Sequence, residues 1–352
     1  MRGLDKKMIN PLISVNLLLY KPGVYLKPCL ESILTQSYKN FELLMTDNAS
    51  GDETVERVKK ILEDSLTTIK WRLIVNEKNL GFAAGHNSSI KESSGELVVL
   101  VNQDVILDEF FLENIIGVFE QDKNIGSAQG KLLRLKVSED KLEKSEVIDN
   151  AGLVILKNRR IIARGQGQED NGQFNKQEEI FGVDGALPVY RREALEDIKI
   201  NLDGKIEYFD EDFFAYKEDV DLAWRLRLYG WQAKYEPKAL AWHARTAGDS
   251  AKTSYIGIIK ERLKINQFGK YHAFKNQRLM QIKNEQIGLL LCHFPRFIFK
   301  EISAWLYVLV FEHYTWKSMK ELFRLAPRAW QKRKIIMAKK KISNDEMKRW
   351  FR

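Results

Sequence analysis

The chain has 352 residues, which is enough for one large domain or two ordinary ones with a substantial buried core. Hydrophobic residues make up 44% and charged residues 30%, the proportions of a folded globular protein with somewhat more charge than usual. The two cysteines, Cys29 and Cys292, are too far apart for a CxxC metal or redox motif, and we interpret them as buried apolar thiols in a reducing compartment.

The net charge of +9 is unevenly distributed. Residues 252–352 contain 23 Lys and Arg residues against 7 Asp and Glu residues, a net charge of +16, whereas residues 1–251 have a net charge of −7. A mildly acidic body therefore continues into a strongly basic C-terminal region. Such a region indicates an anionic partner surface, either nucleic acid or phospholipid.

The first part of the chain alternates apolar runs with helical patterns. We predict strands over residues 13–20, 41–50, 71–77 and 96–105, and helices over residues 25–36, 52–65, 85–94 and 111–122. This alternation implies βαβ units and a mainly parallel sheet covered on both faces. The start of the chain imitates a signal peptide but lacks a small-residue cleavage site, and the run after Pro11 is better explained as the first core strand.

The alternation fades after about residue 135. Residues 149–174 predict a hairpin or a mobile flap, residues 181–198 a strand, a turn and a helix, and residues 229–243 a last strand. From about residue 252 the chain is helical, basic and aromatic, and its two most apolar segments fall short of the roughly 20 residues that cross a bilayer.

These two segments, residues 287–299 and 302–311, favour interfacial helices next to basic clusters at Lys332–Lys334 and Lys339–Lys341. The alternative is a helical subdomain packed on the core, or a dimer contact.

Two predicted strands end in polar side chains, where the carboxyl edge of a parallel sheet presents them to a ligand. Asp47 can accept a hydrogen bond from a nucleotide base there, although a turn residue or a helix N-cap explains it equally well. Asn102, Gln103 and Asp104 end the later strand, and Asp104 can reach a divalent cation that also binds a diphosphate. A strand-ending turn is the alternative explanation.

A Gly-rich segment, NLGFAAGHN, spans residues 79–87 before a predicted helix. Gly81 and Gly85 let backbone N–H groups approach a phosphate, and the start of a helix adds a favourable partial charge. The segment, which ends at Asn87, matches neither a GxGxxG nor a Walker sequence, so it does not indicate those folds. A Gly-rich connection without a ligand is the simpler explanation.

Glu218, Asp219 and Asp221 place three carboxylates within four residues at a predicted helix start. They repel one another unless a helix N-terminus, a metal or a neighbouring Arg offsets the charge. Arg225 lies one turn after Asp221 and can pair with it, which leaves Asp219 free to act as a base. A solvated acidic helix start is the alternative, and His243, taken alone, is more often a packing residue than a ligand.

The chain resembles the inverting family 2 glycosyltransferases of the GT-A fold in seven segments, which are, in order, VNLLLY, TDNAS, NLGFAAGHN, VNQDV, VDGALPVYRREAL, YKEDVDLAWRLRLYGW and WHARTAGDS. The likeness is greatest to the rhamnosyltransferase-like branch that builds bacterial surface polysaccharides. It implies an α/β GT-A nucleotide-diphospho-sugar transferase fold, a mainly parallel sheet flanked by helices. The implied parts are a catalytic domain over residues 1–250, with a nucleotide-sugar-binding half over about 1–130 and an acceptor-binding half over about 131–250, and a helical basic extension over 251–352.

The resemblance also implies a role for each candidate residue. Asp219 matches the catalytic base, with Glu218 as the adjacent alternative, and Asp104 and His243 match the metal site. The D-x-D element of the family has Asn102 in place of its first Asp. The residues assigned to the nucleotide-sugar donor are Leu18, Tyr20, Asp47, Asn48, Gly81, Gly85, Asn87, Asn102 and Gln103. The residues assigned to the acceptor are Asp184, Gly185, Ala186 and Arg225.

The implied reaction moves a sugar, with rhamnose as a candidate, from a nucleotide-diphosphate donor to a hydroxyl of a glycan or polyprenyl-linked acceptor in cell-surface polysaccharide synthesis. It implies inversion at the sugar and Mg²⁺ or Mn²⁺ as cofactor. The basic C-terminal region would hold the enzyme on the anionic inner face of the cell membrane, so a cytoplasmic, peripheral location is expected, with no nucleic-acid partner. The alternative is a non-enzymatic protein that binds nucleic acid or a membrane surface through this region.

Overall fold

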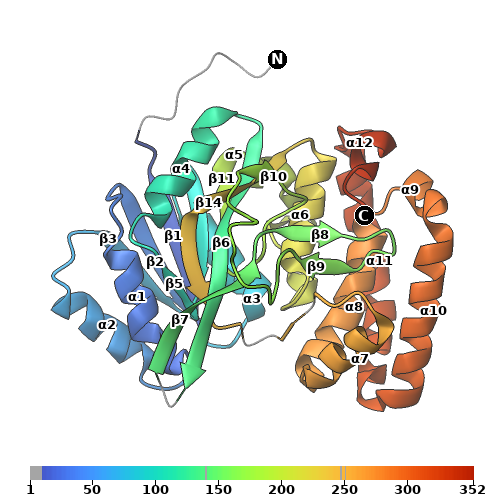
Figure 1. Ribbon diagram of the computed structural model, residues 1–352, viewed down its shortest axis with the longest axis horizontal. Coiled ribbons are helices and arrows are strands. Elements are labelled where there is room, and N and C mark those ends of the chain that lie inside the picture. Colours follow the sequence, from blue (N-terminus) through green and yellow to red (C-terminus); the bar gives the residue numbers. More distant parts are fainter. Residues whose placement is uncertain (1–9, 139–140, 246–247, 250) are drawn as a thin grey trace.

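A computed structural model describes residues 10–138, 141–245, 248–249 and 251–352. The first nine residues of the signal-peptide-like start and positions 246, 247 and 250 of the WHARTAGDS segment lie outside the described residues. A large mixed sheet occupies the middle of the protein, and the helices of the C-terminal region stand together along one side of it (Figure 1).

The sheet has ten strands. In spatial order they are β10 (Glu178–Glu179), β14 (Gln232–His243), β6 (Ile125–Ser138), β11 (Pro188–Arg191), β4 (Leu97–Asn102), β1 (Ile13–Leu19), β2 (Phe41–Asp47) and β3 (Lys70–Val75), while β5 (Val105–Leu107) pairs with β14 and β7 (Lys141–Asn150) with β6. Strands β1 to β4 are parallel, β6 and β14 are parallel to each other, and the antiparallel β11 joins the two groups.

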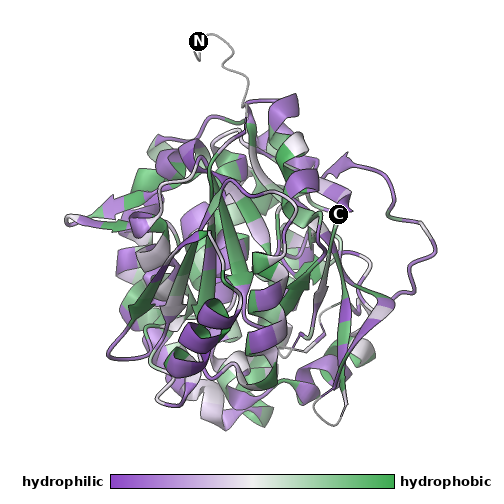
Figure 2. Cartoon of the chain, turned by 90° about the vertical axis from the view of Figure 1, so that its left-hand side faces the viewer, coloured by the Kyte–Doolittle hydropathy of each residue, from purple (hydrophilic) through white to green (hydrophobic). Residues whose placement is uncertain are grey.

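Helices cover both faces of this sheet, as the alternating pattern predicted. One apolar core contains residues of α1 (Leu26–Leu34), α2 (Thr54–Asp64) and α4 (Phe111–Gln121), and the other contains residues of α3 (Gly81–Glu92), α5 (Arg192–Ile198) and α6 (Glu218–Leu228). Strands β1, β2 and β4 are buried along almost their whole length, because their near-continuous apolar sequences suit a sheet covered on both sides. Figure 2 shows apolar strands at the centre and helices with hydrophilic outer surfaces around them.

The Gly-rich segment is part of a helix, so its interpretation as a loop is wrong. Helix α3 begins at Gly81, four residues earlier than predicted. The side chain of Asn79 accepts a hydrogen bond from the Gly81 N–H at 2.8 Å, and that of Asn48 accepts one from the Leu80 N–H at 3.0 Å. These bonds satisfy amides that a helix start leaves without partners.

The predicted hairpin within residues 149–174 is confirmed as β8 (Leu153–Ile155) and β9 (Ile161–Ala163). The long strands β6 and β7 were not predicted. The side chains of β7 are mostly polar and only its last three residues are buried, so this strand lacks the apolar alternation by which a half-buried strand is recognised. A second small hairpin pairs β12 (Ile200–Leu202) with β13 (Lys205–Glu207).

The C-terminal region is helical, as predicted, and packs on the preceding α/β part of the chain. Its helices are α7 (Tyr255–Lys264), α8 (Gln267–Asn284), α9 (Ile287–Cys292), α10 (Phe294–Phe311), α11 (Trp316–Ala338) and α12 (Asn344–Lys348). The backbone N–H of Arg352 donates to the carbonyl of Ile155 at 3.0 Å, which ties the end of the chain to β8. Across the described part of the chain, every helix is too short or too polar to cross a membrane.

Two predictions about this part of the chain need correction. Cys29 is buried, as predicted, but Cys292 is exposed at the end of α9. Lys332, assigned from the sequence to a membrane-facing basic cluster, is fully buried and pairs with Glu207, Asp210 and Asp212. The outward-facing part of that cluster is therefore smaller than the sequence suggested.

Candidate active site

A pocket of about 580 Å³ opens at the carboxyl ends of β1, β4 and β14, which lie at the same edge of the sheet. Helices α3 and α6, the β8–β9 hairpin and the start of α8 complete its walls. Thirteen of the residues that the sequence assigned to a site line it, namely Leu18, Tyr20, Asn48, Gly81, Asn102, Gln103, Asp104, Asp184, Gly185, Ala186, Glu218, Asp219 and His243.

The remaining four assigned residues do not line this pocket. Asp47 is 2% exposed, and its carboxylate accepts hydrogen bonds from the backbone and the hydroxyl of Ser50, so it closes the turn after β2. Gly85 lies inside α3 against Leu18, where an added Cβ would stand 2.7 Å from a Leu18 methyl group. The placement of these two residues supports a structural role, not contact with the donor.

Asn87 and Arg225 have long-range structural partners. The Asn87 side chain accepts from the Phe209 N–H at 2.8 Å and donates to the Phe209 carbonyl at 2.9 Å. Arg225 is fully buried and donates to Asp221 at 3.1 Å, which confirms the predicted pair, and to the carbonyl of Ile198 at 2.9 Å. Neither side chain is available to a ligand in this arrangement.

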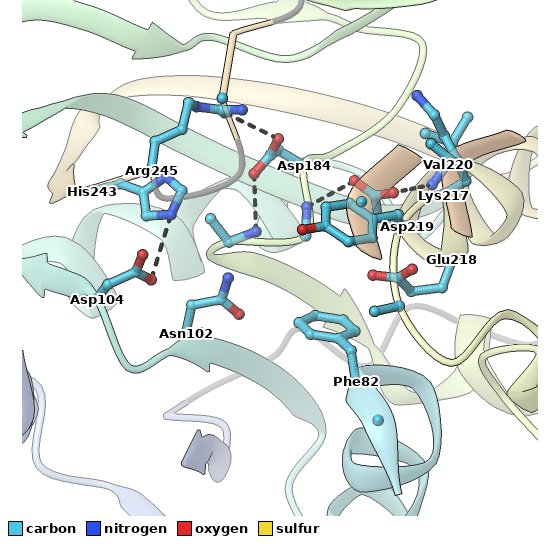
Figure 3. Close-up of a pocket in the computed structure, with 18 of the residues that line it drawn as sticks. Phe82, Asn102, Asp104, Asp184, Lys217, Glu218, Asp219, Val220, His243 and Arg245 are labelled. Carbon is cyan, nitrogen blue, oxygen red and sulfur yellow. Dashed lines mark hydrogen bonds and ion pairs between the residues drawn. The ribbon is translucent and has the colours of Figure 1, made fainter. Parts of the chain in front are cut away.

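Asp219 lies in the first turn of α6 and faces the pocket, as Figure 3 shows. Its carboxylate accepts hydrogen bonds from the Val220 N–H at 2.8 Å and the Gly185 N–H at 3.1 Å. Burial and the charge of Asp184 raise the pKa of Asp219 to about 6, although Lys217 and the two amides oppose this. The carboxylate is therefore mostly ionised at neutral pH and can still accept a proton.

Glu218 differs from its neighbour in both contacts and charge. It is 6% exposed, and its Oε2 has no hydrogen-bond partner among the described residues. Burial, together with the charge of Asp219, raises the pKa of Glu218 well above its usual range. Glu218 therefore keeps its proton to a higher pH than Asp219 does.

A second group lies across the pocket, where β14 ends at His243. The pairing of His243 with Val105 of β5 brings the preceding residue, Asp104, alongside it, and His243 Nε2 lies 3.5 Å from Asp104 Oδ1. The other ring nitrogen, Nδ1, lies 2.9 Å from Asp149 Oδ2. Burial lowers the pKa of His243, but the two carboxylates outweigh this effect and raise it to about 10.

Asp184 connects the Asp219 side of the pocket with the His243 side (Figure 3). Its carboxylate lies 3.5 Å from Arg245 Nη2 and accepts a hydrogen bond from the Ala186 N–H at 2.9 Å. The following residue, Gly185, donates its N–H to Asp219. The segment Asp184–Ala186 therefore fixes Asp219 relative to the His243 side of the pocket.

The sequence interpretation missed Asp149, Arg245 and Lys217. Asp149 lies near the end of β7, much as Asp104 lies just after the end of β4. A polar residue at the end of a strand is a local signal that could have identified Asp149, but β7 itself was not predicted. Arg245 follows His243 by two residues and pairs with Asp149, from which it is 96 residues distant in the sequence. Lys217 lines the pocket in a left-handed conformation, with φ of 74°, directly before the two carboxylates.

The comparison with protein families gives the class of this protein. The family model described as Glycosyl transferase family 2 matches residues 14–199, just over half of the chain. The chain therefore belongs to glycosyl transferase family 2. This span includes β4, almost all of β1, and Asp104, Asp149 and Asp184, but not β14, Asp219 or His243.

Curated relatives extend the likeness beyond that span. Poly-beta-1,6-N-acetyl-D-glucosamine synthase from Staphylococcus epidermidis is 24% identical over 302 residues, which are 85% of this chain and 63% of that protein. The synthase of the same name from Staphylococcus aureus strain COL is 24% identical over 294 residues, or 83% of this chain and 61% of the relative. The chain thus spans less than two thirds of the length of these relatives.

Solved structures confirm the predicted GT-A fold. The mannosyltransferase PcManGT from Pyrobaculum calidifontis, solved in complex with GDP-Man and Mn²⁺, has a TM-score of 0.51 at 15% identity and covers 96% of this chain and 88% of its own. GalNAc-T7, solved with UDP, GalNAc and Mn²⁺, has a TM-score of 0.56 at 11% identity and covers 78% and 48%. At these identities the likeness establishes the fold alone.

Proposed function

We propose that this protein is an inverting glycosyltransferase that uses Asp219 as its catalytic base. The observation that carries the proposal is the position of Asp219, which faces a pocket at the carboxyl edge of a GT-A sheet, opposite Asp104 and His243. Family membership supports glycosyl transfer over the non-enzymatic alternative of a protein that acts only through its basic region.

The chemistry needs one base and no covalent sugar–enzyme intermediate. The acceptor hydroxyl oxygen bonds to the anomeric carbon from the side opposite the diphosphate, the bond from that carbon to the diphosphate oxygen breaks, and the hydroxyl proton passes to Asp219. A pKa of about 6 suits this role, because the carboxylate is ionised at neutral pH and still basic enough to take a proton. Glu218 keeps its proton to a higher pH, which supports Asp219 over its neighbour as the base.

Asp104 and His243 would hold part of a divalent-cation site, in which the cation would displace the Nε2 proton that the two carboxylates otherwise retain on His243. Asp149 holds Nδ1 of His243 and so directs Nε2 toward Asp104, the arrangement that orients histidine ligands in metalloproteins. The described residues contain no cluster of three or more His, Cys, Asp or Glu side chains suited to a metal, so further ligands would come from the donor diphosphate. Mg²⁺ or Mn²⁺ bound there would neutralise charge on the leaving diphosphate.

Family membership and the names of the relatives support a nucleotide-sugar donor, and we extend the proposal to its contacts and to the acceptor. Tyr20, Asn48, Asn102 and Gln103 are the proposed donor contacts, because they line the pocket at the ends of β1, β2 and β4. Rhamnose is the sugar suggested by the sequence resemblance, while the relatives' names point to N-acetylglucosamine and mannose. We infer a role in cell-surface polysaccharide synthesis, with a glycan or polyprenyl-linked acceptor at the cytoplasmic face of the membrane.

The decisive experiment measures nucleoside-diphosphate release from TDP-rhamnose, UDP-N-acetylglucosamine and GDP-mannose, with Mn²⁺, with Mg²⁺ and with a chelator. Slow, metal-dependent release from one donor is expected. Asp219→Asn should lower this turnover by about 10²–10⁴-fold, because the variant keeps the shape of the side chain but cannot accept the proton.

Donor binding measured by calorimetry should be nearly unchanged in Asp219→Asn. Asp64→Asn, which alters an exposed carboxylate at the end of α2, serves as the control and should leave turnover unchanged. Near-normal turnover in Asp219→Asn would remove Asp219 from the role of base, and absence of binding to every donor would contradict glycosyl transfer itself.

A further inference from the structure

The C-terminal region presents an apolar face built from two neighbouring helices. We define the α7–α10 face by six side chains that are between 43% and 70% exposed, namely Ile256, Ile259 and Leu263 of α7 and Ile302, Leu306 and Val310 of α10. Their spacing places each set of three along one side of its helix. Large apolar side chains grouped in this way on a surface indicate an interaction site.

The two stripes lie on the same side of the helix pair. The rings of Tyr255 and Phe299 are 6.1 Å apart, and further along both helices the Arg262 guanidinium lies 5.8 Å from the ring of Tyr307. Helices α7 and α10 therefore run side by side in the same direction. On each helix, the three stripe residues lie beside the residues that make these contacts, and they lie on the same side of the helix pair. The six side chains therefore form one surface.

Folding raises the ratio of basic to acidic residues on the surface of this region above the ratio in its sequence. Glu285, Glu301 and Glu312 are buried in ion pairs with Arg159, Arg278 and Arg262. Among the described residues of 251–352, fourteen Lys and Arg residues are exposed, against only two acidic residues, Asp345 and Glu346. The exposed bases on the helices of the face are Lys260, Lys264 and Arg296.

The α7–α10 face is continuous with the rim of the active-site pocket. Two residues after Leu263, Ile265 lines the pocket, and so does Phe268 at the start of α8. Phe268 is 48% exposed, and its ring lies 6.0 Å from that of Phe214 and 6.1 Å from that of Tyr216, both of which line the pocket. An apolar path therefore leads from the face to the segment that precedes Glu218 and Asp219.

We propose that the α7–α10 face lies on an anionic lipid bilayer, and that the acceptor is anchored in this bilayer by an apolar chain and enters the pocket past Phe268. The proposal rests on the proposed glycosyl transfer and names the acceptor class for the same site. Apolar stripes bordered by lysines match the surface of such a bilayer, where acyl chains lie beneath anionic headgroups. A second copy of the chain fits less well, because a symmetric contact would bring two strongly basic regions together.

The first test is co-sedimentation of the full chain with phosphatidylcholine vesicles that contain or lack phosphatidylglycerol. The wild type should sediment with the anionic vesicles. The double variant Ile302→Glu and Leu306→Glu should lose at least about tenfold in vesicle affinity, because it places two charges in the apolar stripe. The matched control is Leu66→Glu, which changes an 87% exposed residue after α2, at the far end of the protein from α10 (Figure 1).

The second test asks whether the pocket rim lies at the bilayer. Phe268→Cys, in a chain with Cys292→Ser, is labelled with a fluorophore and mixed with vesicles of brominated phosphatidylcholine and phosphatidylglycerol. Quenching is expected at position 268 and not in a matched chain labelled at Leu66→Cys. Sedimentation without quenching at position 268 would overturn the proposed acceptor route.

Equal sedimentation of the double variant and the wild type would overturn the bilayer face. So would a dimer, detected by analytical ultracentrifugation, that the double variant converts to a monomer without any vesicle binding. Neither assay contains a donor, so failure here leaves glycosyl transfer standing. Conversely, loss of donor binding in calorimetry with intact vesicle binding would overturn the proposed function and leave the bilayer face in place.

Discussion

Adjacent carboxylates acquire different proton affinities at the start of α6. Asp219 accepts two backbone N–H bonds and borders the pocket, whereas Glu218 Oε2 has no partner among the described residues. Burial raises the pKa of both groups, but the amides and Lys217 keep that of Asp219 near 6. Local environment, and not residue type, therefore separates the proton affinities of the two neighbours.

This difference predicts the acid limb of the pH–rate profile. As the proposed base, Asp219 would accept a proton only when ionised, so kcat/KM should fall about tenfold per pH unit once the pH drops below about 6, and should level off above it. The measurement is initial nucleoside-diphosphate release in the presence of acceptor, from about pH 5 to pH 8, with protein integrity checked by circular dichroism. An acid limb near pH 4, the usual range of an exposed Asp, would contradict the raised pKa.

Gly185 sets the position of Asp219 through close contact. A Cβ added at Gly185 would lie 3.3 Å from the Asp219 Cβ and 3.5 Å from its Oδ2. Gly185→Ala should therefore displace the base by a few tenths of an ångström and lower kcat by about 10–10²-fold, while donor binding is retained.

The control for this prediction is Gly117→Ala in α4, where an added Cβ meets no atom within 4 Å. It should leave kcat unchanged and stabilise the protein by up to about 1 kcal/mol, because Ala favours a helix over Gly. Equal kcat values for Gly185→Ala and the wild type would show that the position of Asp219 does not depend on this contact.

At the scale of elements, two C-terminal helices hold the acidic segment that leads into α6. Lys332 of α11 lies 2.8 Å from Glu207, 2.5 Å from Asp210 and 2.9 Å from Asp212, and Lys283 of α8 lies 2.8 Å from Asp221. Burial raises the pKa of Asp210, but the two lysines outweigh this effect and hold it well below its usual range.

The backbone between these ion pairs is strained. Phe214, Tyr216 and Lys217 all have φ between 64° and 74°, a region that residues other than glycine adopt rarely and at a cost of roughly 1–3 kcal/mol each. The buried ion pairs on either side restrict the alternatives open to this segment. We infer that α8 and α11 stabilise the segment that places Glu218 and Asp219.

Lys332→Met should therefore destabilise the protein by about 3–5 kcal/mol, because it removes the buried cation that Glu207, Asp210 and Asp212 share and leaves them only partners such as Arg328 and Lys283. The measurement is the midpoint of urea unfolding. Lys334→Met, two residues along the same helix at an exposed position, is the matched control and should change stability by no more than about 0.5 kcal/mol. Similar midpoints for the two variants would show that the ion pairs of Lys332 contribute little to stability.

At the scale of the whole molecule, the C-terminal region is an integral part of the fold. It contributes Met347 and Phe351 to the larger apolar core, and Ile265 and Phe268 to the pocket. Removing residues 285–352 should therefore abolish cooperative unfolding and donor binding together, beyond any loss of membrane contact. Circular dichroism on heating would measure the unfolding, and calorimetry would measure donor binding. A truncated chain that unfolds cooperatively and binds donor would show that residues 1–284 fold independently of the removed helices.

Much of the fold was predictable because its signals are local. The apolar runs at 13–20, 41–50 and 96–105 form β1, β2 and β4, since a strand buried on both faces needs apolar residues at nearly every position. The polar residues after two of them lie at the sheet edge, because parallel strands share one carboxyl end. The polar strand β7 carries no such signal, and it is held by its pairing with β6 and by backbone hydrogen bonds to residues 167–170.

What only the tertiary structure decided is which polar side chains remain free to act. Asn87 and Arg225 are residue types that often bind ligands. Their side chains are instead hydrogen-bonded to the backbone of residues distant in the sequence, Asn87 to Phe209 and Arg225 to Ile198. His243 faces Asp104 because Asp149, 94 residues earlier, holds its other nitrogen. The sequence by itself determined the strands and the chemistry available at their ends. Long-range packing determined which of those groups meet in the pocket, because a hydrogen-bond partner is set by proximity in space and not by spacing along the chain.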